Sequence, residues 1–126
     1  MFALLLVWDF SGKPSQLFEQ LRRYIAGESW ARYAGRQDLR YKVWFSNPAT
    51  GQWGAFYLWD TREALEEEVR TMRRVEAMTG VAPAIHRFEV EAIQEGRHSG
   101  QDLLRAGLAW ASNMDRFRAP FDMRLP

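Results

Sequence analysis

Aromatic rings are the side chains in this sequence whose types and spacing most readily suggest chemistry. Trp53, Tyr57 and Trp59 recur at odd positions of one apolar segment. Trp44 lies in the alternating segment before it, on the more polar face with Arg40 and Lys42. Trp and Tyr carry a polar N–H or O–H on a large apolar ring, which suits the wall of a site for a flat aromatic ligand. The same rings would serve equally as core or as a subunit contact, so both interpretations stay open.

The two histidines, His86 and His98, are the other candidates. They are far apart, no carboxylate cluster accompanies them and the chain has no cysteine, so we predict no metal site and no cofactor. His86 shares a predicted strand face with Phe88, which is typical of a structural side chain. Its functional interpretation is a base or hydrogen-bond donor, because histidine titrates near neutral pH.

Hydrophobic periodicity predicts the elements that position these residues. A helix is expected from Pro14 to a stop at Gly27, and a second from a cap at Asp60 to a stop at Gly80. Glu66 is expected to pair with Arg70 on the surface of that second helix. A hairpin loop is expected at residues 47–51. The predicted strands cover residues 2–8, 39–45, 53–59 and 84–93.

The resulting βαββαβ order predicts an α+β, ferredoxin-like fold, with a four-stranded antiparallel sheet of spatial order 4-1-3-2. The strands at 2–8 and 53–59 are apolar on both faces and should be central, whereas the charged, alternating strands should form the edges. Two helices cover only one face. The other face would expose several hundred Å² of apolar surface, which favours a homodimer whose sheets meet face to face.

The composition changes after Ile93. We therefore expect a ferredoxin-like domain at residues 1–93, followed at 94–126 by a polar linker, a helix over residues 101–114 and an extended arm from residue 116. The helix and arm are expected to pack on the domain or on its partner.

The composition is that of a globular protein, with 47% hydrophobic and 26% charged residues and a net charge of +1. This small net charge does not indicate binding to nucleic acid or to an anionic membrane. The apolar run at residues 2–8 is brief and meets Asp9, so it fits neither a signal peptide nor a membrane span. We expect a cytoplasmic protein.

Several short motifs together resemble the YdhR-like family of candidate mono-oxygenases. This family belongs to the dimeric α/β-barrel superfamily that includes the antibiotic biosynthesis mono-oxygenases. The resemblance covers about residues 2–93 and is carried by Leu39 with Lys42-Val43-Trp44, Gly54, Tyr57-Leu58-Trp59, Ala64-Leu65, Gly80-Val81 and Phe88-Glu89-Val90. It implies a ferredoxin-like fold and a homodimer with facing sheets.

The resemblance also implies an activity. Better-understood relatives oxidise activated polyaromatic phenols without metal or flavin, in pockets lined by Trp, Tyr, Asn and Arg. The matching residues are Trp44 and Tyr57, which would orient the substrate. Strand position adds His86 as base or anion stabiliser, and Asn47, Trp59 and Arg87 as substrate-binding residues. His86 and Arg87 are adjacent in one strand and should face opposite ways.

The first functional hypothesis is thus a cofactor-independent mono-oxygenase-like protein that acts on a small apolar, aromatic molecule. The alternative is a non-catalytic dimeric protein that binds a small molecule. Haem binding through His86 is a further alternative. RNA binding is another, since RNA-recognition motifs share the βαββαβ order, but residues 50–56 lack the leading basic residue of that motif.

Overall fold

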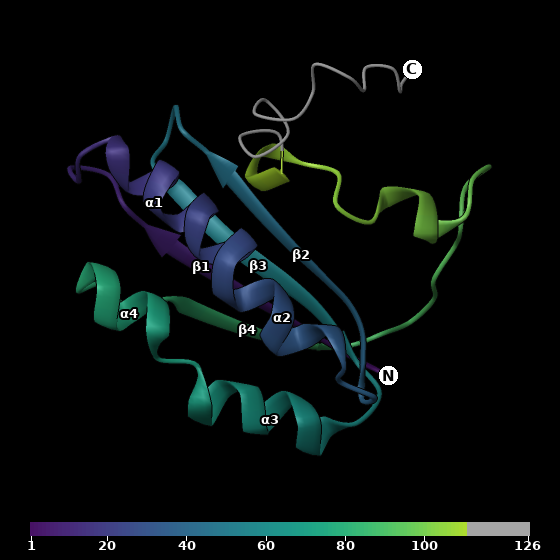
Figure 1. Ribbon diagram of the computed structural model, residues 1–126. Helices are drawn as coiled ribbons and strands as arrows, with labels where there is room; N and C mark the ends of the chain where they lie inside the picture. Colours follow the sequence, from purple (N-terminus) through teal and green to yellow (C-terminus); the bar gives the residue numbers. More distant parts are fainter. Residues whose placement is uncertain (111–126) are drawn as a thin grey trace. The chain divides into compact units, whose positions relative to one another are not determined.

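The computed structural model describes residues 1–110 and confirms the four-stranded antiparallel sheet. Its strands are β1 (Phe2–Asp9), β2 (Leu39–Asn47), β3 (Gln52–Trp59) and β4 (Ala84–Glu89). Their spatial order is β2-β3-β1-β4, so β1 and β3 are central and β2 and β4 are the edges, as predicted (Figure 1). The order of elements and the sheet define an α+β, ferredoxin-like fold.

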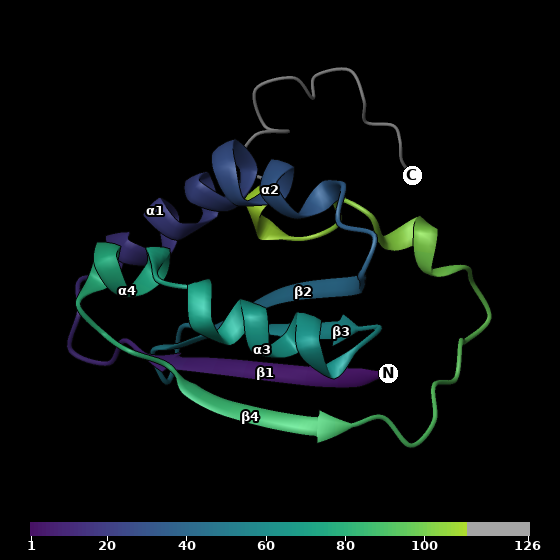
Figure 2. The same cartoon turned by 90° about the horizontal axis from the view of Figure 1, so that it is seen from below.

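Contacts divide the chain into two compact units. The first comprises Met1–Ser15 and Gly35–Ala92 and holds the whole sheet with α3 (Arg62–Thr71) and α4 (Arg74–Thr79). Helix α3 contacts β1 and β3, and Figure 2 shows it lying along one side of the sheet. We call that side of the sheet the α3 side and the opposite one the open face.

Pairing register decides which residues share a face. Leu4 lies opposite Tyr57, and Leu6 opposite Ala55, on the α3 side. These four residues are buried, as are the tryptophans at the two ends of β3. Leu58 and Phe56 point to the open face and are only half-buried. The strand at 52–59 therefore buries one apolar face and leaves a second apolar face partly open.

The loop between β2 and β3 is the predicted hairpin. Asn47 accepts backbone hydrogen bonds from Thr50 and Gly51, and its side chain accepts one from the Ala49 N–H at 3.2 Å. Gly51 has φ of +79°, a left-handed conformation that favours glycine.

The predicted second helix is interrupted. Thr61, not Asp60, caps α3 by accepting a bond from the Ala64 N–H, while Asp60 instead binds Arg40 at 2.6 Å. The helix ends at Thr71, and the guanidinium of Arg73 donates to two of the carbonyls left without a helical partner, those of Val69 and Met72. Helix α4 then ends at Gly80 in the left-handed conformation, as predicted.

Among the described residues, the second unit comprises Gln16–Ala34 and residues 93–110. Its helical part runs through α1 (Gln16–Tyr24), the π-helical η1 (Ile25–Ser29) and α2 (Trp30–Ala34), so the predicted stop at Gly27 is wrong. The buried residues fall every fourth position, at Leu21, Ile25, Ser29 and Tyr33. In a regular α-helix, residues four positions apart are slightly offset around the axis, so a series of them drifts away from one face. The π-helical turn holds more residues per turn and reduces this drift.

The C-terminal segment differs from the single helix expected over residues 101–114. Ser99 caps a short 3-10 helix, η2 (Gly100–Leu103), and Arg105 and Gly107 then take positive φ values of 65° and 114°. An α-helix cannot continue through left-handed residues, so α-helical structure begins again only at Leu108. The rest of the expected helix and the expected arm lie outside the described residues.

Aromatic contacts join this segment to α2 within the second unit. The Trp30 and Trp110 rings meet edge to face, with centroids 5.0 Å apart. The Arg105 guanidinium lies 5.5 Å and 5.0 Å from their centroids. Such cation–π contacts stabilise an association without requiring a continuous helix.

Candidate functional site

The β2–β3 register brings Lys42, Trp44 and Tyr57 together on the α3 side of the sheet. Lys42 lies opposite Tyr57, and Trp44 lies opposite Ala55, one pair further along the same face. A register shift between Leu39 and Tyr41 leaves an extra residue in β2 and turns Leu39 to the face of its partner Trp59. Regular alternation would place Leu39 on the same face as Tyr41, and the bulge explains why the two residues face opposite ways.

The Lys42 ammonium lies between two aromatic rings. Its nitrogen is 4.5 Å from the centroid of Trp44 and 4.6 Å from that of Tyr57, both within cation–π range. Lys42 and Trp44 are half-buried, whereas Tyr57 is buried. The accessible end of the cluster is therefore the end formed by β2.

Helix α3 contributes a buried carboxylate to this cluster. The Tyr57 hydroxyl donates a hydrogen bond of 2.8 Å to Oε2 of Glu68, and the exposed fractions of the two residues are 2% and 3%. Acidic side chains are rarely this buried unless they have partners. We define the Lys42 cluster as Lys42, Trp44, Tyr57 and Glu68.

Sequence reasoning missed Glu68, because it belongs to a run of three glutamates at the start of a helix that suggested a solvated surface. The signal was present in the helical spacing. Glu68 lies four residues after Ala64 and three after Leu65, and all three are buried. Positions separated by three and four residues share one helix face, so Glu68 belongs to the inward stripe.

Trp59 extends the aromatic wall beyond Tyr57. The two rings stack with centroids 5.6 Å apart and an interplanar angle of 16°. The Arg36 guanidinium lies 4.9 Å from the Trp59 centroid and is held by two 3.1 Å hydrogen bonds to Asp38. The Trp59 side chain is fully buried, and its indole N–H has no hydrogen-bond partner among the described residues.

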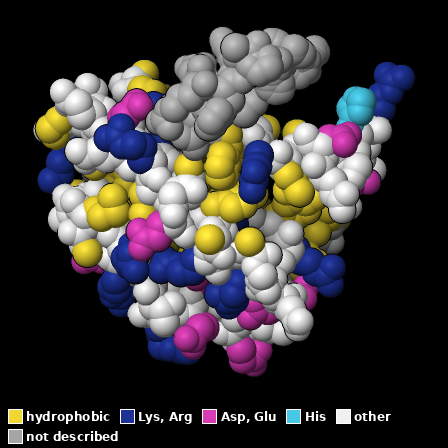
Figure 3. All heavy atoms as spheres, viewed as in Figure 1, with side chains coloured by type: hydrophobic (Ala, Val, Ile, Leu, Met, Phe, Trp, Pro, Cys, Tyr) yellow, Lys and Arg dark blue, Asp and Glu magenta, His cyan; other side chains and the backbone are white. Residues whose placement is uncertain are grey.

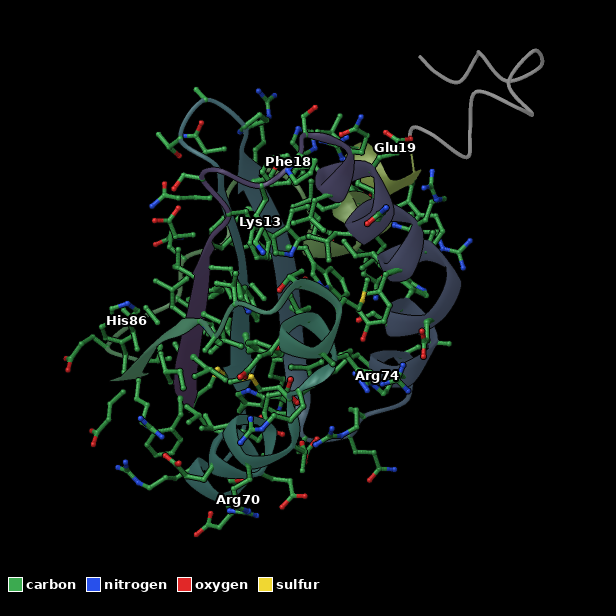
Figure 4. The ribbon with its side chains drawn as sticks, turned by 90° about the vertical axis from the view of Figure 1, so that its left-hand side faces the viewer. Lys13, Phe18, Glu19, Arg70, Arg74 and His86 are labelled. Atoms are coloured by element: carbon green, nitrogen blue, oxygen red, sulfur yellow. The ribbon has the colours of Figure 1, made fainter. Side chains whose placement is uncertain are left out.

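His86 lies on the other face. It pairs with Leu5 across β1–β4 and points to the open face, where its ring lies 6.5 Å from that of Phe88. Figure 4 shows His86 at the left of the view, well apart from Arg70 of α3 at the bottom. The structure therefore does not bring His86 together with Trp44 and Tyr57.

Two further predicted site residues have local structural partners. The Asn47 side chain binds within its own hairpin turn, at the end of β2. The Arg87 guanidinium binds both carboxylate oxygens of Glu66, at 2.8 Å and 3.1 Å, and so joins β4 to α3. The expected pairing of Glu66 with Arg70 is wrong, because Arg70 instead binds Glu67.

These surface ion pairs shift the protonation of their members. The hydrogen bond from Arg87 lowers the pKa of the Glu66 carboxyl, since it stabilises the charged form. For the same reason the Asp60 carboxylate raises the pKa of Arg40. Figure 3 shows acidic and basic side chains interspersed over α3, at the bottom of the view. The electrostatic potential over the surface of α3 therefore has no single sign.

The open face is apolar and uncharged over its centre. Val43 and Phe88 are each 50% exposed, and Tyr41 and Phe45 are 41% and 38% exposed. Half-buried side chains of the central strands fill the space between these edge residues: Leu5, Val7, Phe56 and Leu58. His86, on the edge strand β4, lies at the border of this surface.

Two absences concern residues 1–110. In that part of the chain no helix combines the length and apolar composition needed to cross a bilayer. The same residues contain no group of three or more His, Cys, Asp or Glu side chains placed to hold a metal ion.

Comparison with known proteins shows the fold. A candidate antibiotic biosynthesis monooxygenase from Deinococcus radiodurans superposes with a TM-score of 0.55 and 16% identity, over 75% of this chain and 98% of that one. A protein of unknown function from Nitrosomonas europaea gives the same TM-score with 12% identity, over 77% and 95% of the two chains. No family model and no curated protein matches the sequence. The chain thus has the fold of the superfamily that the sequence motifs resemble.

Proposed function

We propose that this protein is a cofactor-independent mono-oxygenase-like enzyme that oxidises a small, apolar aromatic phenol at the Lys42 cluster. The observation that carries the proposal is the Lys42 ammonium held 4.5 Å and 4.6 Å from the Trp44 and Tyr57 centroids. Aromatic rings suit a flat ligand, and a fixed cation suits a phenolate. The fold shared with a candidate antibiotic biosynthesis monooxygenase supports the same class.

The chemistry needs no external reductant. The phenol first loses its proton, and the phenolate then passes electrons to dioxygen. Overall, a phenol and one O₂ give a quinone and one water, so one oxygen atom enters the product and the other leaves as water. The substrate supplies all four electrons. A cation beside the phenolate favours the first step, because charge in a partly desolvated site is stabilised more strongly than in water.

In this proposal Trp44 and Tyr57 orient the substrate, Trp59 extends the wall and Lys42 stabilises the anion. His86 belongs instead to the open face, through which we propose that two copies form a homodimer. An uncharged apolar face is complementary to itself, so an isologous contact covers both copies at once. The face measures about 400 Å² in projection, from strands about 4.8 Å apart and six residues long. Contiguous apolar patches of a few hundred Å² are often functional surfaces.

Oxygen uptake tests the activity. The wild-type protein, in metal-free buffer, is mixed with a library of naphthols and larger polycyclic phenols, and an oxygen electrode follows consumption. We expect uptake with at least one phenol that binds, and a loss of about 10²-fold for Lys42→Met. Lys13→Met, an exposed lysine outside the cluster, is the matched control. Binding of phenols without any oxygen uptake would refute the enzyme.

A non-catalytic small-molecule-binding protein is the second candidate. The burial of Tyr57 and Glu68 favours it, because a buried hydrogen-bonded pair also serves simply to join β3 to α3. This candidate predicts that phenols raise the Tm, that Lys42→Met weakens this effect, and that no phenol is consumed.

A further inference from the structure

Strand β2 has one residue more than β3, the strand with which it pairs. Leu39 lies opposite Trp59, but Tyr41 lies opposite Leu58, the neighbour of Trp59, so Arg40 is the extra residue. Such a β-bulge frequently lies beside an active site, where it changes the direction of nearby side chains. The place of the bulge along β2 therefore decides which face of the sheet each β2 residue joins.

The other end of β2 is fixed by the hairpin turn, where Asn47 lies opposite Gln52. The extra residue must be accommodated between these two ends. With the bulge next to the turn, Lys42 would pair with Phe56 instead of Tyr57. A shift of one residue turns a side chain to the opposite face, so Lys42 would then point to the open face. The Lys42 cluster therefore requires the bulge to stay at the start of β2.

Two bonds from one residue hold the bulge in this place. Arg40 donates a hydrogen bond of 2.6 Å from its Nε to Oδ1 of Asp60, which directly follows β3. The Asp60 N–H donates to the carbonyl of Asp38, just before β2, at 2.9 Å. We propose that Arg40 and Asp60 are positioning residues, whose ion pair fixes the bulge and so keeps the β2 members of the Lys42 cluster on the α3 side. The catalytic meaning of this role rests on the proposed function.

Burial of apolar side chains alone would not select the observed register. In that register Tyr41 and Val43 lie on the open face, 41% and 50% exposed, while Lys42 lies on the α3 side. With the bulge displaced, these two apolar residues would turn to the α3 side and the lysine would turn away from it. In a single copy of the chain, that arrangement would bury more apolar surface. An anchor at the bulge is therefore needed to favour the observed face.

Two engineered pairs of cysteines report the register, because the chain has no cysteine of its own. Val43→Cys with Phe56→Cys joins residues that lie opposite each other in the observed register. Val43→Cys with Ala55→Cys joins residues that lie opposite each other only when the bulge is displaced. In the observed register the side chains of this second pair point to opposite faces, which does not allow a disulfide. Glutathione buffers give the effective concentration of each thiol pair, and mass spectrometry identifies the intramolecular disulfide.

Each test variant is made in both cysteine backgrounds. Arg40→Gln and Asp60→Asn each remove one charge of the pair, and the exchange Arg40→Asp with Asp60→Arg restores a pair of opposite charges. Arg62→Gln is the matched control. It removes an ion pair of the same type, Arg62 with Glu89 at 3.1 Å, which joins α3 to β4 instead of β2 to β3.

The measured quantity is the ratio of the effective concentration of the displaced-register pair to that of the observed-register pair. We expect Arg40→Gln and Asp60→Asn to raise this ratio about fivefold, the upper range for an exposed ion pair. The exchange should return the ratio to that of the wild type, and Arg62→Gln should leave it unchanged. An unchanged ratio in both single variants would overturn the positioning role, and so would an exchange that restores nothing. The measurement contains no phenol, so failure of the oxygen-uptake test would refute the proposed function and leave the register result unaffected.

Discussion

Replacing Tyr57 by Phe isolates the buried hydrogen bond on which the Lys42 cluster depends. The change removes one oxygen atom and leaves the ring that stacks on Trp59. Glu68 then loses one hydrogen bond of 2.8 Å in a position that is 3% exposed. A hydrogen bond to a carboxylate contributes about 2 kcal/mol to the free energy of unfolding. Part of the loss on its removal comes from leaving the carboxylate oxygen buried without this donor.

The expected change in Tm follows from the size of the chain. At about 2.1 cal/mol/K per residue, 126 residues give an unfolding entropy of about 0.26 kcal/mol/K. A loss of about 2 kcal/mol therefore lowers the Tm by about 8 °C. Calorimetry at one fixed protein concentration measures it. Tyr24→Phe is the matched control, because the Tyr24 hydroxyl accepts its hydrogen bond from Arg32 in an exposed position. A Tyr57→Phe variant that melts within 1–2 °C of the wild type, about a quarter of the expected shift, would refute the reasoning.

Three further predictions follow from other parts of the first unit. Gly54→Ala should destabilise the fold by about 2 kcal/mol, because its Cβ would overlap the Phe45 ring and lie 2.8 Å from the Leu6 carbonyl oxygen. Gly27→Ala is the control and should be tolerated, because its Cβ would meet no atom within 4 Å. Equal denaturant midpoints for the two variants would contradict the expected difference in stability. Arg87 lowers the pKa of Glu66 below its ordinary value of 4.5, so their pair stabilises the fold above that pH and is lost as the pH falls through the lowered pKa. On acid titration, Glu66→Gln should therefore lose less stability in that pH range than the wild type loses. An equal loss in the two proteins would show that the Glu66–Arg87 pair does not cause it. Val43→Glu places a charge on the open face and should convert the proposed dimer to monomer in sedimentation equilibrium, whereas Lys13→Glu should not.

The sheet was predictable because its evidence is local and periodic. Apolar residues on both faces of 2–8 and 53–59 mark central strands, and charged alternation marks the edges, which leads directly to the observed order. The breaks in the helices were harder to predict. Gly27 resembled a stop, but a wider helical turn carries the chain through it, and Met72 ends α3 without Gly or Pro. Arg105 takes a left-handed conformation that few residue types signal in advance.

The candidate site was predictable only in part. Trp44 and Tyr57 could be placed on one side of the sheet because strand alternation and hairpin register determine side-chain direction. His86 could not be placed relative to them, because its face depends on the register of β4 against β1, which no short loop specifies. Placing Glu68 in the site from the sequence would have required knowing which turn of α3 contacts the sheet. Its neighbours Glu66 and Glu67 have the same chemistry and opposite surroundings.

Isotopically labelled dioxygen tests the central claim most directly. The wild-type protein is incubated in metal-free buffer with a phenol that it binds, and mass spectrometry follows the label into quinone and water. The proposed reaction predicts that one labelled oxygen atom enters the quinone and that Lys42→Met forms about 10²-fold less of it. Unlabelled product, or bound phenol recovered unchanged while labelled dioxygen persists, would contradict the assignment of mono-oxygenase chemistry to the Lys42 cluster.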